Sequence, residues 1–383
     1  MDLREVVIVS AARTPVGSFN GSLSSIAAPK LGAVATEEAI KRAGIDKSEV
    51  DEVIFGCVLP AGLGQAPARQ VAIYAGLDKN VGALTINKVC GSGLKSVMLA
   101  AQAIACGDAD VIVAGGMENM SQAPFLMKNA RNGFRLGHGK VLDSMVHDGL
   151  WDVYNDFHMG NAAELCAREC DIPRDSQDEF AINSYKRAQK AQEEGRFKDE
   201  IAPVEVKGRK GSVIVDTDEE PARVKFEKIP TLRPAFDKEG TVTAANASSI
   251  NDGAAAVVLM SKEKADALGL KPMVKIVAQA SAGRNPEWFT KAPIDAIGKV
   301  LAKAKMTKDD IDLFEVNEAF AVVSLITNRE LELDNDKVNV NGGAIAIGHP
   351  IGASGTRILT TLLYAMKNRN AKRGLATLCI GGG

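Results

Sequence analysis

The stretch LTINKVCGSGLKSVMLAAQAIACGDADVIVAGG (84–116) decides the fold of this chain. It contains a run of strand-forming residues, a turn with a cysteine followed by glycines, a long helical segment and a second apolar run. Apolar residues recur at spacings of three and four between Leu94 and Ala105, which places them on one face of a helix. A strand, a tight turn, a helix and a strand in this order predict an α/β fold.

The same order of elements returns near the end of the chain, in ASGTRILTTLLYAM (353–366) and GLATLCIGGG (374–383). Three pairs of residues match at offsets of 261, 262 and 266 positions: Asp51 with Asp312, Gly93 with Gly355, and Gly115 with Gly381. A nearly constant offset predicts a duplicated α/β half. Strands that alternate with helices favour mostly parallel sheets with helices on both faces.

The middle of the chain, 121–249, breaks this pattern. It predicts one helix near 160–170 and another near 175–194, the second with Pro173 before it and Asp175 and Ser176 as possible caps. The strand pattern resumes in ASSINDGAAAVVLMS (247–261). The sequence therefore predicts three regions: an N-terminal half formed by 1–120 and 250–271, a loop domain at 121–249, and a C-terminal half at 272–383.

The composition excludes several classes of function. With 383 residues and 46% hydrophobic side chains, the chain can bury more than one core. A formal charge of −2 offers none of the clustered positive charge that nucleic acid or membrane binding needs. Arg4 and Glu5 interrupt what would be a signal peptide, and we expect no apolar run to span a bilayer, so the predicted location is the cytoplasm.

Six cysteines are too scattered for a disulfide framework. We expect Cys57 and Cys106 to pack in the core. Cys166 and Cys170 are four apart on a predicted helix, but no further ligand pair is evident, so packing is favoured over a metal site.

Cys90 is the strongest candidate for chemistry. It lies between a strand and a helix, where backbone N–H groups and the positive end of the helix dipole favour a thiolate. The glycines that follow it would let a substrate approach the backbone closely. The alternative is a small buried cysteine at a tight turn.

His349 lies in NGGAIAIGHPIGASG (341–355), a glycine-rich turn before the helix that matches the Cys90 helix. If two such halves pack about a pseudo-twofold axis, the turn that contains Cys90 and the turn that contains His349 meet. A nucleophile and a base would then be neighbours, as nucleophilic catalysis requires. The alternative is a turn histidine with structural hydrogen bonds.

Two further groups follow predicted strands. Cys379 precedes the final glycines and could act as a second acid or base, with glycine N–H groups as an oxyanion pocket. Asn317 and Glu318 follow the strand FEV at the strand end where open α/β sheets place their sites. An asparagine there can hold a water or a carbonyl group. The alternative for Cys379 is a buried strand cysteine, and the alternative for Asn317 is a turn cap.

Several blocks resemble the signature sequences of the thiolase family: NKVCGSGLKS (87–96), GGMENMS (115–121), NEAFA (317–321), NGGAIAIGHPIGASG (341–355) and CIGGG (379–383). The resemblance extends from VVIVSAARTPVG (6–17) to the last residue. FHMG (157–160) resembles the short-chain, biosynthetic branch more than the long-chain degradative enzymes. The resemblance implies two similar α/β halves in a five-layer αβαβα sandwich, with an inserted loop domain that binds coenzyme A.

The resemblance also implies a division of roles. Cys90 takes the acetyl group of one acetyl-CoA while His349 removes its thiol proton. Cys379 then removes an α-proton from a second acetyl-CoA, and the resulting carbanion gives acetoacetyl-CoA. The N–H groups of Cys90 and Gly381 form one oxyanion hole, and His349 with a water held by Asn317 forms the other.

For the CoA and acyl pocket the resemblance implies a set of seven residues: Leu150, His158, Met159, Arg223, Ser248, Ala319 and Phe320. It implies no metal or redox cofactor, because coenzyme A is substrate and product. It also implies a homodimer or homotetramer, with the segment near 121–140 as a tetramer contact.

The sequence departs from the family pattern in three places. Thiolases usually continue for about ten residues past the glycine triplet as a final strand. Either this sequence is trimmed or the strand is absent, and in the second case we expect unpaired backbone beside the last strand. Ala245 and Ser249 replace more usual glycines near the pantetheine loop. Trp288 and Phe289 stand where the wall of the acyl pocket is expected.

Three other functions remain open. A ketoacyl-synthase-like condensing enzyme shares the duplicated core, but it would use histidines in place of Cys379. A degradative thiolase would accept longer acyl chains. A binding protein without catalysis is disfavoured because Cys90, His349, Asn317 and Cys379 occur together.

Overall fold

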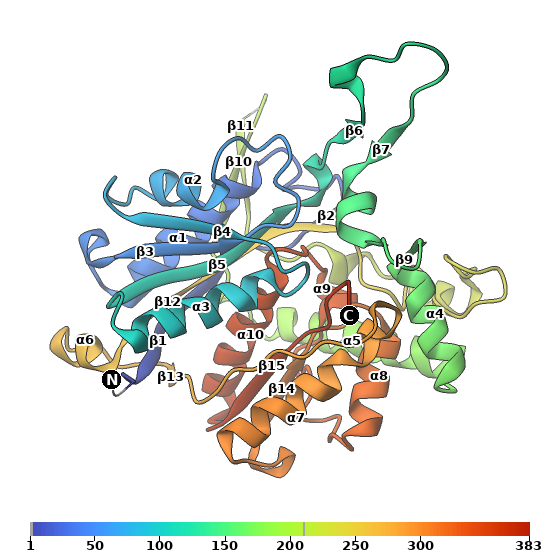
Figure 1. Ribbon diagram of the computed structural model, residues 1–383. Coiled ribbons are helices and arrows are strands. Elements are labelled where there is room, and N and C mark those ends of the chain that lie inside the picture. The colour runs from blue at the N-terminus through green and yellow to red at the C-terminus, as the bar shows by residue number, and fades with distance from the viewer. Residues whose placement is uncertain (1–2, 210) are drawn as a thin grey trace.

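The structure is a computed structural model that describes residues 3–209 and 211–383. Two α/β units pack against each other, the first above the second in the view of Figure 1. The main sheet of the first unit has the strand order β13-β1-β12-β5-β3-β4, with β2 beside β12. Its strands are β1 (Val6–Arg13), β2 (Gly17–Ser18), β3 (Glu52–Gly56), β4 (Gly82–Ile86), β5 (Val111–Asn119), β12 (Asn251–Ser261) and β13 (Val274–Lys275).

This sheet is mixed, so the prediction of a mostly parallel sheet was wrong. β3 pairs with β4 and β5 in parallel, whereas β12 runs antiparallel to β1 and to β5. The reason lies in the connection. A helical crossover between neighbouring strands yields a parallel pair, but β12 follows β5 only after the long middle region and enters the sheet from the opposite end.

Helices cover both faces of the first sheet. α1 (Ala28–Ala43) and α2 (Pro67–Tyr74) pack on the outer face, in one apolar core with β1, β3, β5 and β12. α3 (Ser92–Cys106) packs on the inner face, where Leu363 and Tyr364 of α10 (Ser354–Arg369) join the same core. α3 and α10 therefore form the central layer between the two units.

The second unit contains the parallel strands β14 (Leu313–Val316) and β15 (Gly374–Thr377). Its helices are α7 (Ala292–Ala304), α8 (Ala321–Glu330), the short α9 (Ala344–Ile347) and α10. Ile297 of α7 packs on the outer side of β14 and β15. The order of layers is thus helix, sheet, paired helices, sheet and helix, which confirms the predicted duplicated five-layer sandwich.

The matched aspartates show the duplication at the level of single hydrogen bonds. Asp51 Oδ2 accepts the N–H groups of Asp110 and Val111 at 2.8 and 2.9 Å, at the start of β5. In the other half, Asp312 Oδ2 accepts the two N–H groups that precede β15, from Lys372 and Arg373, at 2.7 and 2.9 Å. Each aspartate fixes the start of the strand that follows the central helix of its half.

The matched glycines mark where the two central helices cross. A Cβ atom on Gly93 would lie 2.8 Å from the backbone nitrogen of Thr356, and one on Gly355 would collide with Leu94. The Thr356 hydroxyl also donates to the Gly93 carbonyl at 2.8 Å. The first turns of α3 and α10 thus meet backbone to backbone, as the pseudo-twofold arrangement predicts. The glycine at 93 serves this helix contact, whereas we expected it to admit a substrate.

The middle region forms two helices and three hairpins. α4 (Met159–Glu169) and α5 (Arg174–Glu193) lie where the sequence predicts helices. The N-cap of α5 is Pro173, without a side-chain capping bond, so the expected caps at 175 and 176 were wrong. The hairpin strands are β6 (Phe125–Met127) with β7 (Val141–Asp143), β8 (Trp151–Asp152) with β9 (Phe157–His158), and β10 (Val204–Gly208) with β11 (Gly211–Val215). The hairpin of β6 and β7 projects away from the body (Figure 1).

Shorter helical segments complete the chain. They are α6 (Lys262–Ala267), η1 (Lys47–Glu49), η2 (Met120–Gln122), η3 (Ala130–Asn132), η4 (Met145–Leu150), η5 (Glu220–Arg223), η6 (Phe226–Thr231), η7 (Pro286–Lys291) and η8 (Lys308–Asp310). η4 is a π-helix, and the others of the η series are 3-10 turns.

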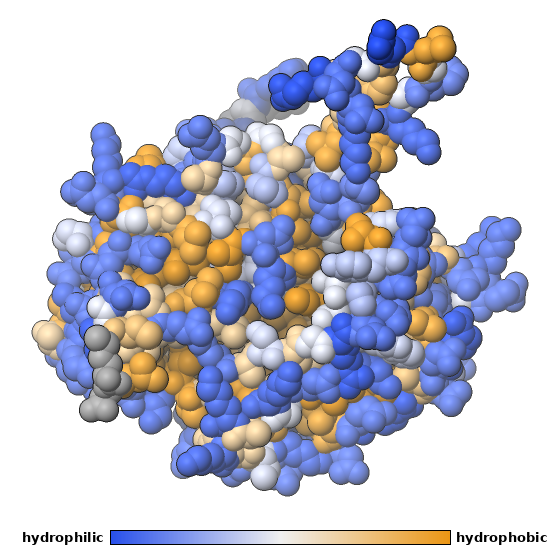
Figure 2. All heavy atoms as spheres, viewed as in Figure 1, coloured by the Kyte–Doolittle hydropathy of each residue, from blue (hydrophilic) through white to orange (hydrophobic). Residues whose placement is uncertain are grey.

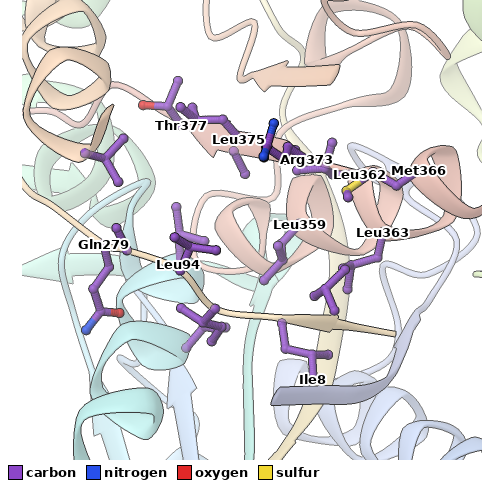
Figure 3. A pocket seen from close by; sticks show the side chains of 18 of the residues that line it. Ile8, Leu94, Gln279, Leu359, Leu362, Leu363, Met366, Arg373, Leu375 and Thr377 are labelled. Carbon is purple, nitrogen blue, oxygen red and sulfur yellow. The ribbon is translucent and has the colours of Figure 1, made fainter. Parts of the chain in front are cut away.

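A groove of about 1590 Å³ separates the two units beside β15. Figure 3 shows its apolar walls, with Ile8 on one side, Leu375 on the other and Leu94, Leu359 and Leu363 between them. Apolar side chains gather on the same face of the molecule in Figure 2. In the first unit the corresponding place, between β5 and β1, is filled by β12. In the described part of the chain, β15 pairs only with β14.

The segment Val89–Cys106 is long and apolar enough for a membrane span by composition alone. This differs from the expectation that no run reaches that length. The segment contains α3, which lies in the central layer of the fold, so its apolar character follows from packing. Cys106, expected in the core, is exposed at the last residue of α3, whereas the other five cysteines are buried.

Candidate active site

The Cys90 side chain is held at a strained turn between β4 and α3. The preceding residue, Val89, has φ of 47°, a left-handed conformation that is unfavourable for a β-branched side chain. The turn is closed by two backbone bonds, from Gly91 N–H to the Lys88 carbonyl and from Ser92 N–H to the Val89 carbonyl, both at 3.0 Å. The strain is retained because the turn projects the cysteine toward the second half.

The end of the chain lies directly against this turn. The Gly381 N–H lies close enough to the Cys90 sulfur to lower the pKa of that thiol, and Cys90 lies close enough to Cys379 to raise the pKa of Cys379. A Cβ atom on Gly91 would lie 3.0 Å from Ile380, and one on Gly381 would lie 3.3 Å from the Met159 sulfur. Cys90, Cys379 and Gly381 are thus brought together, as the sequence predicts.

Both cysteines are thiols in the resting site. Burial raises the pKa of Cys90 to about 11, although the Gly381 N–H opposes this shift. Burial raises the pKa of Cys379 well above its ordinary value. The expectation that the helix N-terminus favours a Cys90 thiolate was therefore wrong, because the loss of water outweighs the helix dipole.

His349 is oriented by two neighbours. Its backbone N–H donates to Asn251 Oδ1 at 2.9 Å, and its Nδ1 lies 2.6 Å from Ser354 Oγ. The Ser354 hydroxyl lies 2.9 Å from the Pro350 carbonyl, and when it donates its single proton there it accepts from His349 Nδ1–H. This assigns the free lone pair to Nε2, which is buried without a partner among the described residues.

The imidazole is neutral in this environment. Burial, together with the charge of Arg357, lowers the pKa of His349 to about 3. The pair at rest is therefore a thiol and a neutral base, not an ion pair. Ile351, two residues after His349, packs in one apolar cluster with Cys90, which places the histidine turn beside the nucleophile.

Asn317 is buried with both amide atoms free of partners in residues 3–209 and 211–383. Only its backbone is fixed, by a bond from its N–H to the Thr377 carbonyl at 3.0 Å. A buried amide without partners is costly, so it indicates a place for a water or a substrate group. Its neighbour Glu318 has a different role. It accepts from Ser184, Asn339 and the N–H of Ile345, and so holds the turn that leads to His349.

An aromatic wall surrounds Cys379. The Phe320 ring meets Phe236 and Phe289 edge to face, with centroids 6.2 and 6.3 Å apart. Phe236 in turn stacks on His158 at 4.8 Å. Phe289, with Trp288 against it, belongs to the apolar cluster of Cys379, where the sequence predicts the wall of the acyl pocket.

The remaining predicted pocket residues lie beside Cys379, beside Cys90, or, for Arg223, away from both. Met159 and Ala319 share the apolar cluster of Cys379, and Ser248 donates from its N–H and hydroxyl to the Ala319 carbonyl at 3.0 and 2.9 Å. Leu150 packs with Cys90. Arg223 is exposed on η5, which lies against α5 and α9, and is not part of these clusters.

Three residues of the site were not predicted from the sequence. Ser354 fixes the histidine tautomer, Asn251 holds the histidine backbone, and Glu118 accepts from the loops on both sides of Cys90. Ser354 stands in the same block as His349 and five residues after it, so its position before a helix was a signal for it. Glu118 stands in the block GGMENMS (115–121), but its contacts could not be predicted, because its partners are distant in sequence.

A duplicated α/β fold that joins two thiols, a neutral buried histidine and an oxyanion donor defines an acyltransferase with a cysteine nucleophile. The chain belongs to the thiolase family. Residues 6–263 match the family model for the N-terminal domain of thiolase, and residues 270–383 match that for the C-terminal domain.

Relatives and a solved structure agree over the whole length. The chain is 58% identical to an acetyl-CoA acetyltransferase of Syntrophomonas wolfei, with 99% of this chain and 97% of that protein covered. It is 56% identical to an acetyl-CoA acetyltransferase of Cupriavidus necator, with 100% and 98% covered. The crystal structure of the Bacillus anthracis acetyl-CoA acetyltransferase superposes with a TM-score of 0.98 at 42% identity, covering 100% of this chain and 97% of that chain.

Proposed function

We propose that this chain condenses two molecules of acetyl-CoA to acetoacetyl-CoA and CoA in a reversible reaction through an acetyl-cysteine. The observation that carries the proposal is the meeting of Cys90, Cys379 and the Gly381 N–H. The names of relatives at 52–58% identity support acetyl-CoA as the substrate.

In the first step the Cys90 sulfur attacks the thioester carbonyl while His349 Nε2 takes the thiol proton. General-base transfer suits a thiol and an imidazole that are both neutral at rest. The N–H groups of Cys90 and Gly381 stabilise the negative oxygen. The departing CoA sulfur takes the proton of Cys379, which leaves acetyl-Cys90, free CoA and a Cys379 thiolate.

In the second step the Cys379 thiolate removes an α-proton from another acetyl-CoA. The enolate oxygen is stabilised by protonated His349 and by a water on Asn317, whose free amide suits this role. The enolate carbon attacks acetyl-Cys90 and forms the new bond. The Cys90 sulfur leaves and recovers its proton from His349, so the site returns to its resting state.

For the pantetheine arm and acyl group we propose Leu150, His158, Met159, Ser248, Ala319 and Phe320. These residues line the apolar and aromatic surroundings of Cys90 and Cys379. Arg223 stays a proposal based on resemblance alone, since its exposed position on η5 offers no contact with that wall. The chemistry uses only the thioester and protein groups, so we propose no metal or redox cofactor.

We further propose a homodimer or homotetramer in the cytoplasm. The projecting hairpin of β6 and β7 supports a tetramer contact, because it exposes a set of apolar side chains (Figure 2): Phe125, Met127, Phe134, Leu136 and Val141. A measured molecular mass by light scattering, compared with a variant in which Phe125 and Leu136 are serine, tests this contact.

The function itself is tested by thiolysis and condensation assays. Purified protein should cleave acetoacetyl-CoA in the presence of CoA, and should form it from acetyl-CoA when a downstream reaction removes the product. Malonyl-CoA with release of labelled bicarbonate is the contrasting assay for a ketoacyl synthase. Activity with malonyl-CoA alone would contradict the proposal, and faster thiolysis of long-chain 3-ketoacyl-CoA would assign the broader degradative function.

A further inference from the structure

Glu118, at the carboxyl end of β5, is fully buried and has no part in the reaction proposed above. Its carboxylate lies between two loops that flank Cys90. One is the loop after β3, which contains Val58, and the other is the turn after His349, which contains Gly352. A buried acid between the loops that carry a nucleophile and a base calls for an explanation.

Four donors surround this carboxylate. Oε2 accepts the N–H groups of Val58 and Gly352, both at 2.9 Å. Oε1 accepts the N–H of Leu59 at 3.1 Å and the thiol of Cys57 at 3.6 Å. Three of these are backbone amides, which can only donate, so both carboxylate oxygens are held as acceptors.

All of these donors are neutral. In the described ranges 3–209 and 211–383, no lysine or arginine forms an ion pair with Glu118. Burial raises the pKa of Glu118 to about 7. A buried charge without a cation stabilises a fold poorly. Glu118 therefore serves to hold two backbone segments, which are distant in sequence, at a fixed distance from each other.

We propose that Glu118 is the positioning residue that sets the distance between Cys90 and His349. The proposal rests on the function proposed above. Val58 and Ile351 pack with Cys90 in one cluster, so both joined loops touch the nucleophile. Gly352 is three residues from His349, and a Cβ atom there would lie 2.5 Å from Glu118 Oε2, so the close contact requires glycine.

The ionised form of Glu118 has a second consequence. Glu118 adds to the effect of burial in raising the pKa of Cys90. The other titratable groups that face Cys90 are Cys379 and His349, both neutral at rest. A thiol of higher pKa is more nucleophilic once its proton is removed. Burial is the main reason that the resting sulfur stays protonated, and the Glu118 charge adds to it, so the thiol depends on the base that Glu118 helps to position.

The test compares two variants of the full-length enzyme with a matched control. Glu118→Gln keeps the size but removes the charge and turns an NH₂ group toward amide donors. Glu118→Asp keeps the charge but is too short to reach both loops. The control, Glu219→Gln, alters a carboxylate that also accepts backbone N–H groups, from Ser18 and Ser22, away from the Cys90 cluster.

Two rates are measured for each protein: single-turnover acetylation of Cys90 by acetyl-CoA, and alkylation of Cys90 by iodoacetamide across pH. Both Glu118 variants should acetylate about 100-fold more slowly, the size of effect for a misplacement of about 1 Å. Only Glu118→Gln should move the alkylation profile to lower pH, because only it removes the charge. The control should change neither rate by more than about twofold.

The outcomes separate the two proposals. If the wild-type protein is not acetylated, the proposed function fails. If the wild type is acetylated and Glu118→Gln keeps the wild-type rate and profile, Glu118 does not position the pair. An equal loss of rate in Glu219→Gln would likewise contradict the positioning role. If Glu118→Gln does not fold, Glu118→Asp decides, because wild-type acetylation in that variant would overturn the proposal.

Discussion

The turn that leads into α3 and the turn that leads into α10 occupy matched places in the two halves, yet they carry different chemistry. The first turn presents Cys90 from a strained backbone. The second presents His349, held by Asn251 and Ser354. The central helices cross where Gly93 meets Gly355, so the duplication itself brings the two corners together. A repeated fold thereby supplies an asymmetric pair, the proposed nucleophile from one copy and its proposed base from the other.

The halves also differ in their sheets. In the first, β12 lies between β5 and β1, whereas the matching space beside β15 is the apolar groove of Figure 3. The groove therefore corresponds to the position of a strand, and its walls are apolar because a sheet interior is apolar. The groove is therefore not the substrate pocket proposed above, since Cys90 and Cys379 are not among the residues that line it.

The largest predicted effect separates the two cysteines. Cys90→Ser and Cys379→Ser should each lower condensation by at least about 10³-fold, because each removes an essential group. Only Cys90→Ser should abolish acetylation, since Cys379 acts as acid and base and not as the acceptor of the acetyl group. The measurement is intact-protein mass after incubation with acetyl-CoA. Loss of acetylation in both variants to the same degree would refute this division of labour.

The crossing of the helices can be broken by a single methyl group. Gly355→Ala should destabilise the fold by about 3 kcal/mol, because its Cβ would collide with the Leu94 backbone and force α3 and α10 apart. The matched control is Gly298→Ala in α7, where nothing lies within 4 Å of a new Cβ. That change should stabilise the helix by about 0.5–1 kcal/mol. Urea unfolding measures both, and equal effects would show that the helices do not cross at Gly355.

The histidine corner is tested at Ser354. Ser354→Ala removes the acceptor for His349 Nδ1–H, so the tautomer with the proton on Nε2 becomes populated. In that tautomer Nε2 has no free lone pair and cannot take the Cys90 proton. Acetylation should slow by about 10- to 100-fold, a fraction of what a general base contributes. The nitrogen chemical shifts of the imidazole report the tautomer directly. An unchanged tautomer and rate would mean that the hydroxyl does not orient the ring.

A smaller effect concerns pH. The pKa of His349 is lowered from 6.5 to about 3 in the folded chain, so the unfolded chain binds the proton more tightly. Its contribution to stability is fully present above pH 6.5 and is lost as the pH falls toward 3. Between these values the slope is at most about 1.4 kcal/mol per pH unit. His349→Asn should lack this part of the acid destabilisation when unfolding is compared at pH 7 and pH 5, and identical slopes would contradict a neutral buried histidine.

Most of the architecture could be predicted from the sequence, because it depends on local periodicity and on a repeat visible at a constant offset. The direction of β12 could not, since it depends on how the middle region returns to the sheet. The exposure of Cys106 was also missed, because a helix pattern does not say how far the partner layer extends.

The candidate site was predictable in part for a similar reason. Cys90, His349, Asn317 and Cys379 follow strands or precede helices, so their places follow from the repeat. The protonation state of Cys90 could not be predicted from the repeat, because it depends on how much water the packed site excludes. Glu118 stands in the block GGMENMS (115–121), but its role could not be predicted, since its partners at 58, 59 and 352 come together only in the folded chain.

The most direct test of the account is to find the acetyl group. After brief incubation with acetyl-CoA, tryptic digestion separates the peptide VCGSGLK (89–95), which contains Cys90, from GLATLCIGGG (374–383), which contains Cys379. We expect one acetyl group on the first peptide, none on the second, and an equal amount of free CoA. An acetyl group on the second peptide, or neither peptide modified in a folded protein, would contradict the assignment of Cys90 as the nucleophile.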